Sequence, residues 1–244
     1  MIKKAFHTGN HVLLVAAAFL CNLALVAIPM IPAQVSHSEN FQARAPHSAR
    51  AAAPVIFPEE MEREDFSAVR KYAAQYGVDY RLILSIIRQE SSFDREAVSG
   101  RGAAGMMQIM PVTNAEITSQ LEILDPSHPS ENVRAGIYYF AKLARLFKNA
   151  SPDDRLSLAL AAYNAGPSRI YDAQELAAYM GEDPSTWRAV ARALPLLSKR
   201  YYSLHAHVWD AARPKYGYYG SSRQTITYVD RVMNSYETLR ADLN

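Results

Sequence analysis

Glu90 interrupts the apolar face of a predicted helix. Ile83, Ile86 and Ile87 recur before it at helical spacing and predict a buried face. Continuing that face along the helix reaches Glu90, and Phe93 comes next. Burial beside apolar side chains disfavours the charged form of a carboxyl group and raises its pKa, as a proton donor near neutral pH requires. The spacing therefore predicts that Glu90 is a general acid.

The residues after Glu90 favour a cleft at this end of the helix. Two serines follow Glu90 directly, and three glycines lie within residues 100–105. Glycines let the backbone turn through positive φ or approach another segment closely. The alternative interpretation is structural, in which Glu90 lies on a helix shoulder or pairs with Arg88 or Arg95.

The elements that position Glu90 are expected to be helices. Phe66, Val69 and Ala73 mark an amphipathic helix, which Gly77 can end. Asp79 is the expected N-cap of the next helix, the one that carries the carboxyl group.

Helix start signals recur in the later part of the chain. They are Ser130 and Ser151 as caps, the Asp183–Pro184 pair, and Pro195, and a tyrosine- and glycine-rich loop over 216–220 precedes a last helix. Few Val, Ile and Thr residues alternate with a period of two. The predicted class is therefore mainly α, with at most a small β-like element in the loop after Glu90.

The two ends of the chain differ in composition. The chain has 244 residues, of which 49% are hydrophobic and 20% charged, which suits one globular domain. Lys3 and Lys4 precede an apolar run over 12–31, and the small residue Ala33 follows it at a possible cleavage site. Residues 1–33 are therefore expected to be a cleaved export signal. An uncleaved anchor that tethers the protein to the membrane through residues 12–31 is the alternative. Residues 34–61 form a predicted Ala-, Pro- and Ser-rich linker, and residues 62–244 the folded domain.

Cysteine and charge exclude several classes of function. Cys21 is the single cysteine and lies within the export signal, where Leu20 disfavours lipidation. Cleavage removes two of the 26 Lys and Arg residues and leaves 24 against 24 Asp and Glu. A near-neutral chain of this kind argues against broad nucleic-acid binding. His205 and His207 lack a third ligand at metal-site spacing, so neither a metal nor a cofactor is expected.

Four sequence motifs follow one another along the chain. They are Glu90-Ser91-Ser92-Phe93, the run GAAGMMQIMP over 102–111, Ala162-Tyr163-Asn164-Ala165-Gly166, and Tyr228-Val229. In this order they resemble the motifs of soluble-type (SLT) lytic transglycosylases, goose-lysozyme-like enzymes that cleave the glycan strands of bacterial peptidoglycan. The resemblance covers about residues 66–239. The segment from Asp183 onward is similar to the catalytic module of membrane-bound lytic transglycosylase F.

The resemblance implies a lysozyme-like helical domain with a substrate cleft. Glu90 would be the single acid and base that cleaves the β-1,4 bond between N-acetylmuramic acid and N-acetylglucosamine. The 6-hydroxyl of the muramic acid would then close on its own C1 and leave a 1,6-anhydro end. Because that nucleophile is intramolecular, one carboxyl group is enough, and Asp94 is expected to face solvent or to cap the helix.

The resemblance also assigns substrate-binding residues. They are Ser99, Gln108, Tyr163, Asn164 and Tyr228, with Asn164 and the Tyr228 hydroxyl expected near Glu90. Each has a structural alternative. Ser99 could be a turn serine, and the Gln108 amide could satisfy backbone groups of the loop. Tyr163 and Asn164 could form a helix C-cap, and Tyr228 could be a half-buried core tyrosine. All of the residues that form the site should converge on one cleft.

Two positions depart from the family pattern. Gln224 stands where the family commonly has Glu, and Arg101 stands where many members have a small residue. Tyr216, Tyr218 and Tyr219 either stack on sugar rings or pack within the loop.

The expected function is lytic cleavage of peptidoglycan by an exported protein of the periplasm or cell envelope. The alternatives are a hydrolytic lysozyme, which releases reducing ends, and a non-catalytic module that holds glycan or docks a cell-wall machine.

Overall fold

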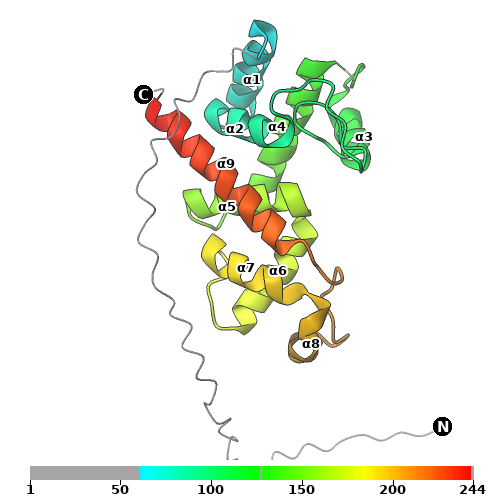
Figure 1. The fold of residues 1–244 in the computed structure, drawn as a ribbon, viewed down its shortest axis with the longest axis vertical. Coiled ribbons are helices and arrows are strands. Elements are labelled where there is room, and N and C mark those ends of the chain that lie inside the picture. Colours follow the sequence, from blue (N-terminus) through cyan, green and yellow to red (C-terminus); the bar gives the residue numbers. More distant parts are fainter. Residues whose placement is uncertain (1–60, 127, 243–244) are drawn as a thin grey trace, which may run out of the picture. The chain divides into compact units, whose positions relative to one another are not determined.

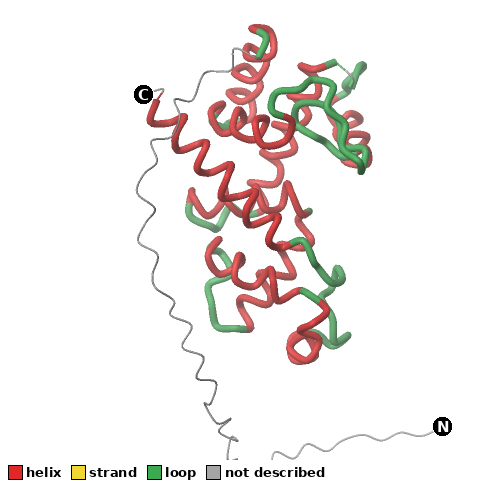
Figure 2. Tube along the Cα trace, in the orientation of Figure 1, coloured by secondary structure: helices red, strands yellow, loops and turns green. Residues whose placement is uncertain are grey.

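The computed structural model describes residues 61–126 and 128–242. In chain order the elements are α1 (Arg63–Tyr76), α2 (Tyr80–Ser91), α3 (Pro111–Leu121), α4 (Pro129–Leu146), α5 (Pro152–Ala165), α6 (Pro167–Tyr179), α7 (Trp187–Ala193), the 3-10 helices η1 (Leu194–Leu197) and η2 (Lys199–Tyr201), α8 (Tyr202–Val208) and α9 (Ser222–Asp242) (Figure 1). Loops join them in the described part of the chain (Figure 2). Between α2 and α3, isolated antiparallel bridges pair Val98 with Ala104 and Ala104 with Ile109. The predicted mainly α class with at most a small β-like element is confirmed.

The predicted export signal or anchor lies outside the described residues, as does the linker up to residue 60. None of the helices described from residue 61 onward is long and apolar enough to cross a membrane. Helix α1 begins at Arg63, one residue after the predicted start of the folded domain.

Local signals fix the ends of the first two helices. Gly77 ends α1 with φ of 70°, in the left-handed region that glycine adopts without a steric penalty. Asp79 caps α2 by accepting a hydrogen bond from the Arg81 backbone N–H. Ser151 caps α5 in the same way, through the backbone N–H of Asp154. These three sequence predictions are confirmed.

Other predicted helix starts are wrong. The N-cap of α4 is His128 and not Ser130, because Pro129 takes the first helical position and leaves the residue before it as the cap. The Asp183–Pro184 pair forms a turn in which the Asp183 carboxylate accepts the Ser185 N–H, and α7 begins after Thr186.

Two later segments also differ from the sequence predictions. Pro195 lies in the 3-10 helix η1, and the next α-helix begins only at Tyr202. Helix α6 was not predicted, since Gly166 and Pro167 read as a stop, whereas Gly166 turns the chain with φ of 85° and Pro167 starts a new helix.

Helix α5 lies at the centre of the core. Its residues from Ser157 to Ala162 are buried on every side, as expected for a helix surrounded by others. It contacts α4, α6, α7 and α9. Helix α9 packs against both α2 and α5 (Figure 1), so it brings the C-terminal segment to the helix that carries Glu90.

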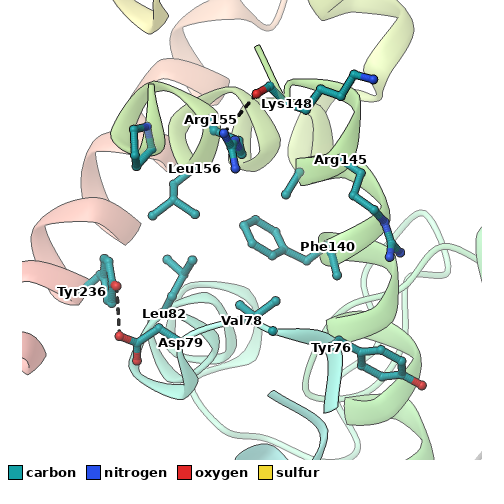
Figure 3. Close-up of a pocket in the computed structure, with 14 residues that line it drawn as sticks. Tyr76, Val78, Asp79, Leu82, Phe140, Arg145, Lys148, Arg155, Leu156 and Tyr236 are labelled. Carbon is teal, nitrogen blue, oxygen red and sulfur yellow. Dashed lines mark hydrogen bonds between the residues drawn. The ribbon is translucent and has the colours of Figure 1, made fainter. Parts of the chain in front are cut away.

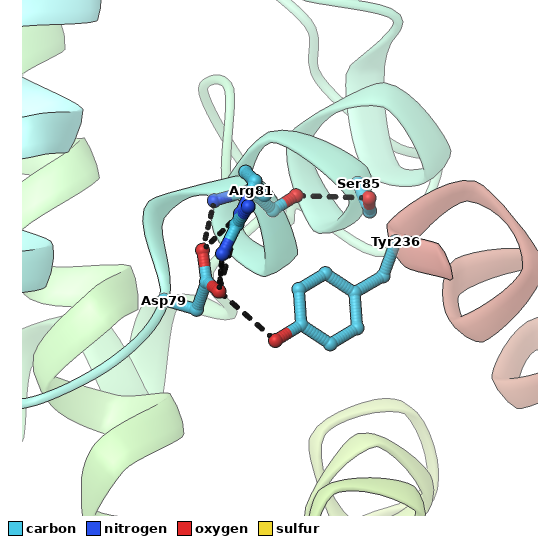
Figure 4. A network of polar contacts seen from close by, with 4 residues as sticks. All are labelled: Asp79, Arg81, Ser85 and Tyr236. Atoms are coloured by element: carbon cyan, nitrogen blue, oxygen red, sulfur yellow. Dashed lines mark hydrogen bonds and ion pairs between the residues drawn. The ribbon is translucent and has the colours of Figure 1, made fainter. Parts of the chain in front are cut away.

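A polar network at the start of α2 holds α9 in register. Asp79 accepts hydrogen bonds from the Arg81 guanidinium and, at 3.0 Å, from the Tyr236 hydroxyl of α9 (Figure 4). The Ser85 hydroxyl donates to the Arg81 carbonyl oxygen in the next turn. Asp79 therefore fixes α9 near its C-terminal end, far along the helix from Tyr228.

The loop over 92–110 is fastened to the helices around it. At its start, the Arg95 Nε donates to the buried Asp65 carboxylate of α1 at 2.5 Å. At its far end, the Asn132 side chain of α4 accepts the Met107 N–H and donates to the Ala104 carbonyl oxygen. The loop reaches α4 because Gly136 has no side chain there: a Cβ would lie 2.5 Å from the Cβ of Met107.

Candidate active site

Glu90 lies in the last turn of α2 and is half-buried. The Tyr228 hydroxyl of α9 donates a hydrogen bond to Glu90 Oε1 at 2.7 Å. The structure thus brings together two side chains that are 138 positions apart in the sequence. Arg95, a candidate partner of Glu90 in the structural interpretation, instead pairs with Asp65 and Glu62.

Burial raises the pKa of Glu90 from 4.5 to about 7, while the hydrogen bond from Tyr228 lowers it. The carboxyl group is therefore protonated in a large fraction of molecules at neutral pH. Burial, together with the nearby Glu90 charge, raises the pKa of Tyr228 well above its ordinary value. Tyr228 consequently keeps its proton and remains a hydrogen-bond donor to Glu90.

A pocket of about 510 Å³ opens at Glu90. It is lined by Gln89, Glu90, Asn164, Arg223, Gln224, Thr227, Tyr228 and Arg231. Glu90 is the one carboxyl group among these lining residues. Of the predicted site residues, Glu90, Asn164 and Tyr228 thus line one pocket, whereas Ser99, Gln108 and Tyr163 do not line it.

A hydrogen-bond chain fixes the side chain of Asn164 at the end of α5. The buried Thr225 hydroxyl donates to Asn164 Oδ1 at 2.8 Å. Because that hydroxyl has only one proton, the Tyr219 hydroxyl 2.6 Å away must donate to Thr225. This orientation engages the amide oxygen of Asn164, a residue that also lines the pocket.

Tyr163 lies next to Asn164 but makes a structural contact. Its hydroxyl donates to the Met107 carbonyl oxygen at 2.7 Å, and its ring packs against Tyr139 and Phe140. Burial, and then the charge of Glu90, raise the pKa of Tyr163 well above its ordinary value. Tyr163 therefore joins α5 to the loop over 92–110 close to the acid.

Ser99 and Gln108 do not line the pocket at Glu90. Ser99 Oγ accepts the Ala103 N–H in a turn. The Gln108 amide donates to the carbonyl oxygens of Ala97 and Gly105. Both residues hold the loop in shape, and their roles in substrate binding stay predictions.

The tyrosine-rich loop before α9 is also tied down. The Asp172 carboxylate of α6 accepts the backbone N–H groups of Lys215 and Tyr216. Tyr219 is engaged with Thr225, whereas Tyr216 and Tyr218 are exposed. Tyr219 thus packs within the fold, and the Tyr218 ring contacts the buried His205 ring at 5.7 Å between centroids. Sugar stacking stays a prediction for Tyr216 and Tyr218.

Apart from Tyr228 and Gln224, the sequence analysis did not identify the residues that α9 contributes to the pocket. Thr225 was not singled out, nor were Arg223, Thr227 and Arg231, which repeat every four residues on one face of the helix. That spacing around Tyr228 was the available signal.

A second pocket of about 410 Å³ lies at the other end of α2 (Figure 3). Leu82, Phe140 and Leu156 point into it. Its carboxyl group is Asp79: although burial acts to raise the pKa of Asp79, hydrogen bonds from Arg81 and Tyr236 hold that pKa below its ordinary value. An ionised and paired carboxylate is a poor proton donor, so the chemistry points to the Glu90 pocket.

Comparisons with known proteins find similar sequences and a similar fold. Residues 67–184 match the transglycosylase SLT domain family. The chain is 35% identical over 173 residues to a membrane-bound lytic murein transglycosylase F from Desulfosudis oleivorans. This alignment covers 70% of this chain and 35% of that protein. It is 38% identical over 131 residues to membrane-bound lytic murein transglycosylase F 1 from Alkalilimnicola ehrlichii. This second alignment covers 53% of this chain and 26% of that protein.

A solved structure shares the fold. The 70 kDa soluble lytic transglycosylase SLT70 from Escherichia coli superposes with a TM-score of 0.50 at 22% identity, over 73% of this chain and 24% of that one. The aligned part of the chain spans only 35% and 26% of the lengths of these two relatives. On the domain match and these relatives, residues 67–184 are similar to the transglycosylase SLT domain found in lytic transglycosylases.

Proposed function

We propose that this protein cleaves the β-1,4 bond between N-acetylmuramic acid and N-acetylglucosamine in peptidoglycan by lytic transglycosylation, with Glu90 as both acid and base. The observation that carries the proposal is the position of Glu90, a half-buried carboxyl group with a raised pKa, hydrogen-bonded to Tyr228 in an open pocket. The names of the relatives, lytic murein transglycosylases, support this choice of substrate.

In the first step Glu90 acts as the acid. The Tyr228 O–H occupies Oε1, so the carboxyl proton lies on Oε2 and is available to the pocket. That proton passes to the glycosidic oxygen, the bond from C1 to this oxygen breaks, and the leaving sugar departs with a free hydroxyl group. Positive charge develops on the muramic acid ring as Glu90 becomes a carboxylate.

In the second step Glu90 acts as the base. Its carboxylate takes the proton of the 6-hydroxyl of the same muramic acid, whose oxygen forms a bond to C1. This step closes the 1,6-anhydro ring, returns Glu90 to its protonated form and consumes no water. An intramolecular nucleophile has a high effective concentration, so one carboxyl group can serve both steps. The Tyr228 hydrogen bond stabilises the carboxylate between them.

The remaining site residues take supporting roles in this proposal. Asn164 offers its NH₂ group to the sugar in the pocket, with its orientation set by Thr225. Ser99 and Gln108 are proposed to contact the glycan from the loop over 92–110, and Tyr163 from the adjoining end of α5. No cofactor takes part in the reaction.

The proposed place of action is the periplasm or cell envelope. The apolar run over 12–31 is proposed to export the protein and, if uncleaved, to tether it to the membrane. The relatives are named as membrane-bound proteins, which supports an envelope location.

Product analysis tests the proposal. Purified sacculi are digested with the wild-type protein and with Glu90→Gln, and the released fragments are analysed by mass spectrometry. We expect 1,6-anhydro-muramic ends from the wild-type protein and at least a thousandfold slower release from the variant. Reducing ends would indicate a hydrolytic lysozyme. Binding to sacculi without any product would indicate a non-catalytic module.

A further inference from the structure

One face of α9 carries a polar and positively charged stripe into the pocket. Arg223, Thr227 and Arg231 are each four residues apart, all three are exposed, and all three line the pocket that contains Glu90. Because a helix rises 1.5 Å per residue, the stripe extends for about 12 Å, with a hydroxyl group between two guanidinium groups.

The two arginines of this stripe lack an acidic partner among the residues that the structure describes. No ion pair within residues 61–126 and 128–242 includes Arg223 or Arg231. The acidic residues Asp230 and Glu237 of the same helix line a different pocket, on another face. The wall of the Glu90 pocket formed by α9 is therefore positively charged.

These arginines do not serve to ionise Glu90. The pKa of Glu90 is raised by burial and lowered by the Tyr228 hydroxyl, and neither arginine contributes to the shift. With its acid protonated, the pocket carries the charge of Arg223 and Arg231 without compensation. Guanidinium groups bind carboxylates through two parallel hydrogen bonds, so the stripe is suited to an anionic ligand.

We infer that Arg223, Thr227 and Arg231 form a subsite for the carboxylates of the peptide that peptidoglycan carries on its muramic acid. The inference rests on the proposed function, because the glycan strand must lie at Glu90 for its peptide to reach α9. The subsite makes the protein select strands that bear peptides over bare glycan.

The test compares two substrates that differ only in the peptide. Soluble glycan strands are used as isolated, or after an amidase has removed their peptides and the lactyl carboxylates left by that hydrolysis have been capped as methylamides. Binding of each is measured with the full chain carrying Glu90→Gln, in which the strands are not consumed, with and without Arg223→Gln and Arg231→Gln together. We expect the arginine changes to weaken binding of peptide-bearing strands by about tenfold or more and to leave bare strands within about twofold. High salt should weaken the first interaction and not the second.

Arg145→Gln is the matched control, since Arg145 is an exposed arginine at the other pocket and likewise makes no ion pair in the described chain. It should change neither binding constant, and thermal unfolding confirms that each variant is folded. Equal binding of both strands by the parent protein, or equal losses on both strands in the arginine variant, would overturn the subsite. Failure of the proposed function can be told apart from failure of the subsite. It appears as the absence of anhydro products from digestion with the wild-type protein, whichever strands the protein binds.

Discussion

The raised pKa of Glu90 has a cost in stability that depends on pH. In the unfolded chain the carboxyl group ionises near its ordinary value of 4.5, whereas in the folded protein it ionises near 7. Below pH 4.5 the Glu90 carboxyl group is protonated in both states, so its ionisation does not change the free energy of unfolding. As the pH rises to 7, the unfolded state gains a favourable ionisation that the folded state lacks, so stability falls and then levels off.

Replacing Glu90 with Gln should remove this cost, because the amide does not ionise and its oxygen can still accept the Tyr228 hydrogen bond. We expect Glu90→Gln to raise the free energy of unfolding above pH 7, by on the order of 3 kcal/mol, and to leave it unchanged at pH 4. Thermal or denaturant unfolding at the two pH values measures the difference. An equal effect at both would contradict the burial of the carboxyl group.

Tyr228 should control both the rate and the pH range of the reaction. Removing its hydroxyl takes away the hydrogen bond that lowers the pKa of Glu90, so that pKa rises further. For Tyr228→Phe we expect activity to fall by about tenfold to a hundredfold, because the carboxylate formed in the first step loses a stabilising donor. The alkaline limb of the pH–rate profile should move to higher pH.

Tyr236→Phe is the control for this change. Tyr236 lies on the same helix, but its hydroxyl donates to Asp79 in the other pocket. It should leave the pH–rate profile in place. An unmoved alkaline limb in Tyr228→Phe would show that the hydrogen bond does not tune the acid.

At the scale of elements, α9 is joined to α5 through Thr225. Without the Thr225 hydroxyl, Asn164 Oδ1 and the Tyr219 hydroxyl both lose a partner. We expect Thr225→Val to lower kcat/KM by about tenfold and stability by about 1–3 kcal/mol. Thr225→Ser should restore most of the activity.

Thr238→Val serves as the comparison, because the Thr238 hydroxyl only bonds the Asn234 carbonyl oxygen of its own helix. If Thr225→Val lost stability but kept the wild-type kcat/KM, Thr225 would be a structural residue and not one that positions Asn164.

The contact of the loop with α4 depends on Gly136. Alanine usually stabilises a helix relative to glycine, but here its Cβ would clash with buried Met107, whose carbonyl oxygen accepts the Tyr163 hydroxyl. We expect Gly136→Ala to lower the free energy of unfolding by about 1–3 kcal/mol. Gly100→Ala, at a position with nothing within 4 Å of the new Cβ, should be neutral. Differential scanning calorimetry compares the two variants, and equal transition temperatures would contradict the close packing.

The sequence predicted those parts of the site that depend on local pattern. The helix period placed Glu90 on an apolar face, and Asp79 and Gly77 were recognisable as helix ends because caps act within one turn. Helix α6 was missed because Gly166 and Pro167 end one helix and begin the next with the same residues that normally mark a loop. The cap at Ser130 was wrong for a related reason, since Pro129 had already fixed the first helical position.

Other features of the site depend on packing between distant segments. The helical spacing around Tyr228 marked Arg223 and Arg231 as neighbours of the site, but only the packing of α9 on α2 shows that they share a pocket with Glu90. The sequence also could not show that Gln108 donates its amide to backbone oxygens of its own loop. Such contacts are decided by the tertiary structure, and the motif alone predicted only the residue type.

At the scale of the whole described domain, the fold assigns different work to the two ends of α2. At the first end, Asp79 is held ionised and ties down the C-terminal part of α9. At the second, burial raises the pKa of Glu90 to about 7, so that a substantial fraction stays protonated at neutral pH, beside the N-terminal part of the same helix. The packing of α9 along α2 and α5 thus both stabilises the domain and assembles the acid, its hydrogen-bond donor and Asn164.

The central claim is that the carboxyl group of Glu90 directs ring closure within the substrate and not attack by water. Digestion of sacculi in heavy-oxygen water measures this directly, because hydrolysis would place the solvent oxygen at C1 of every new muramic acid end. We expect 1,6-anhydro ends free of the label, formed by the wild-type protein and lost in Glu90→Gln. Labelled reducing ends, or anhydro ends released at the wild-type rate by the variant, would contradict it.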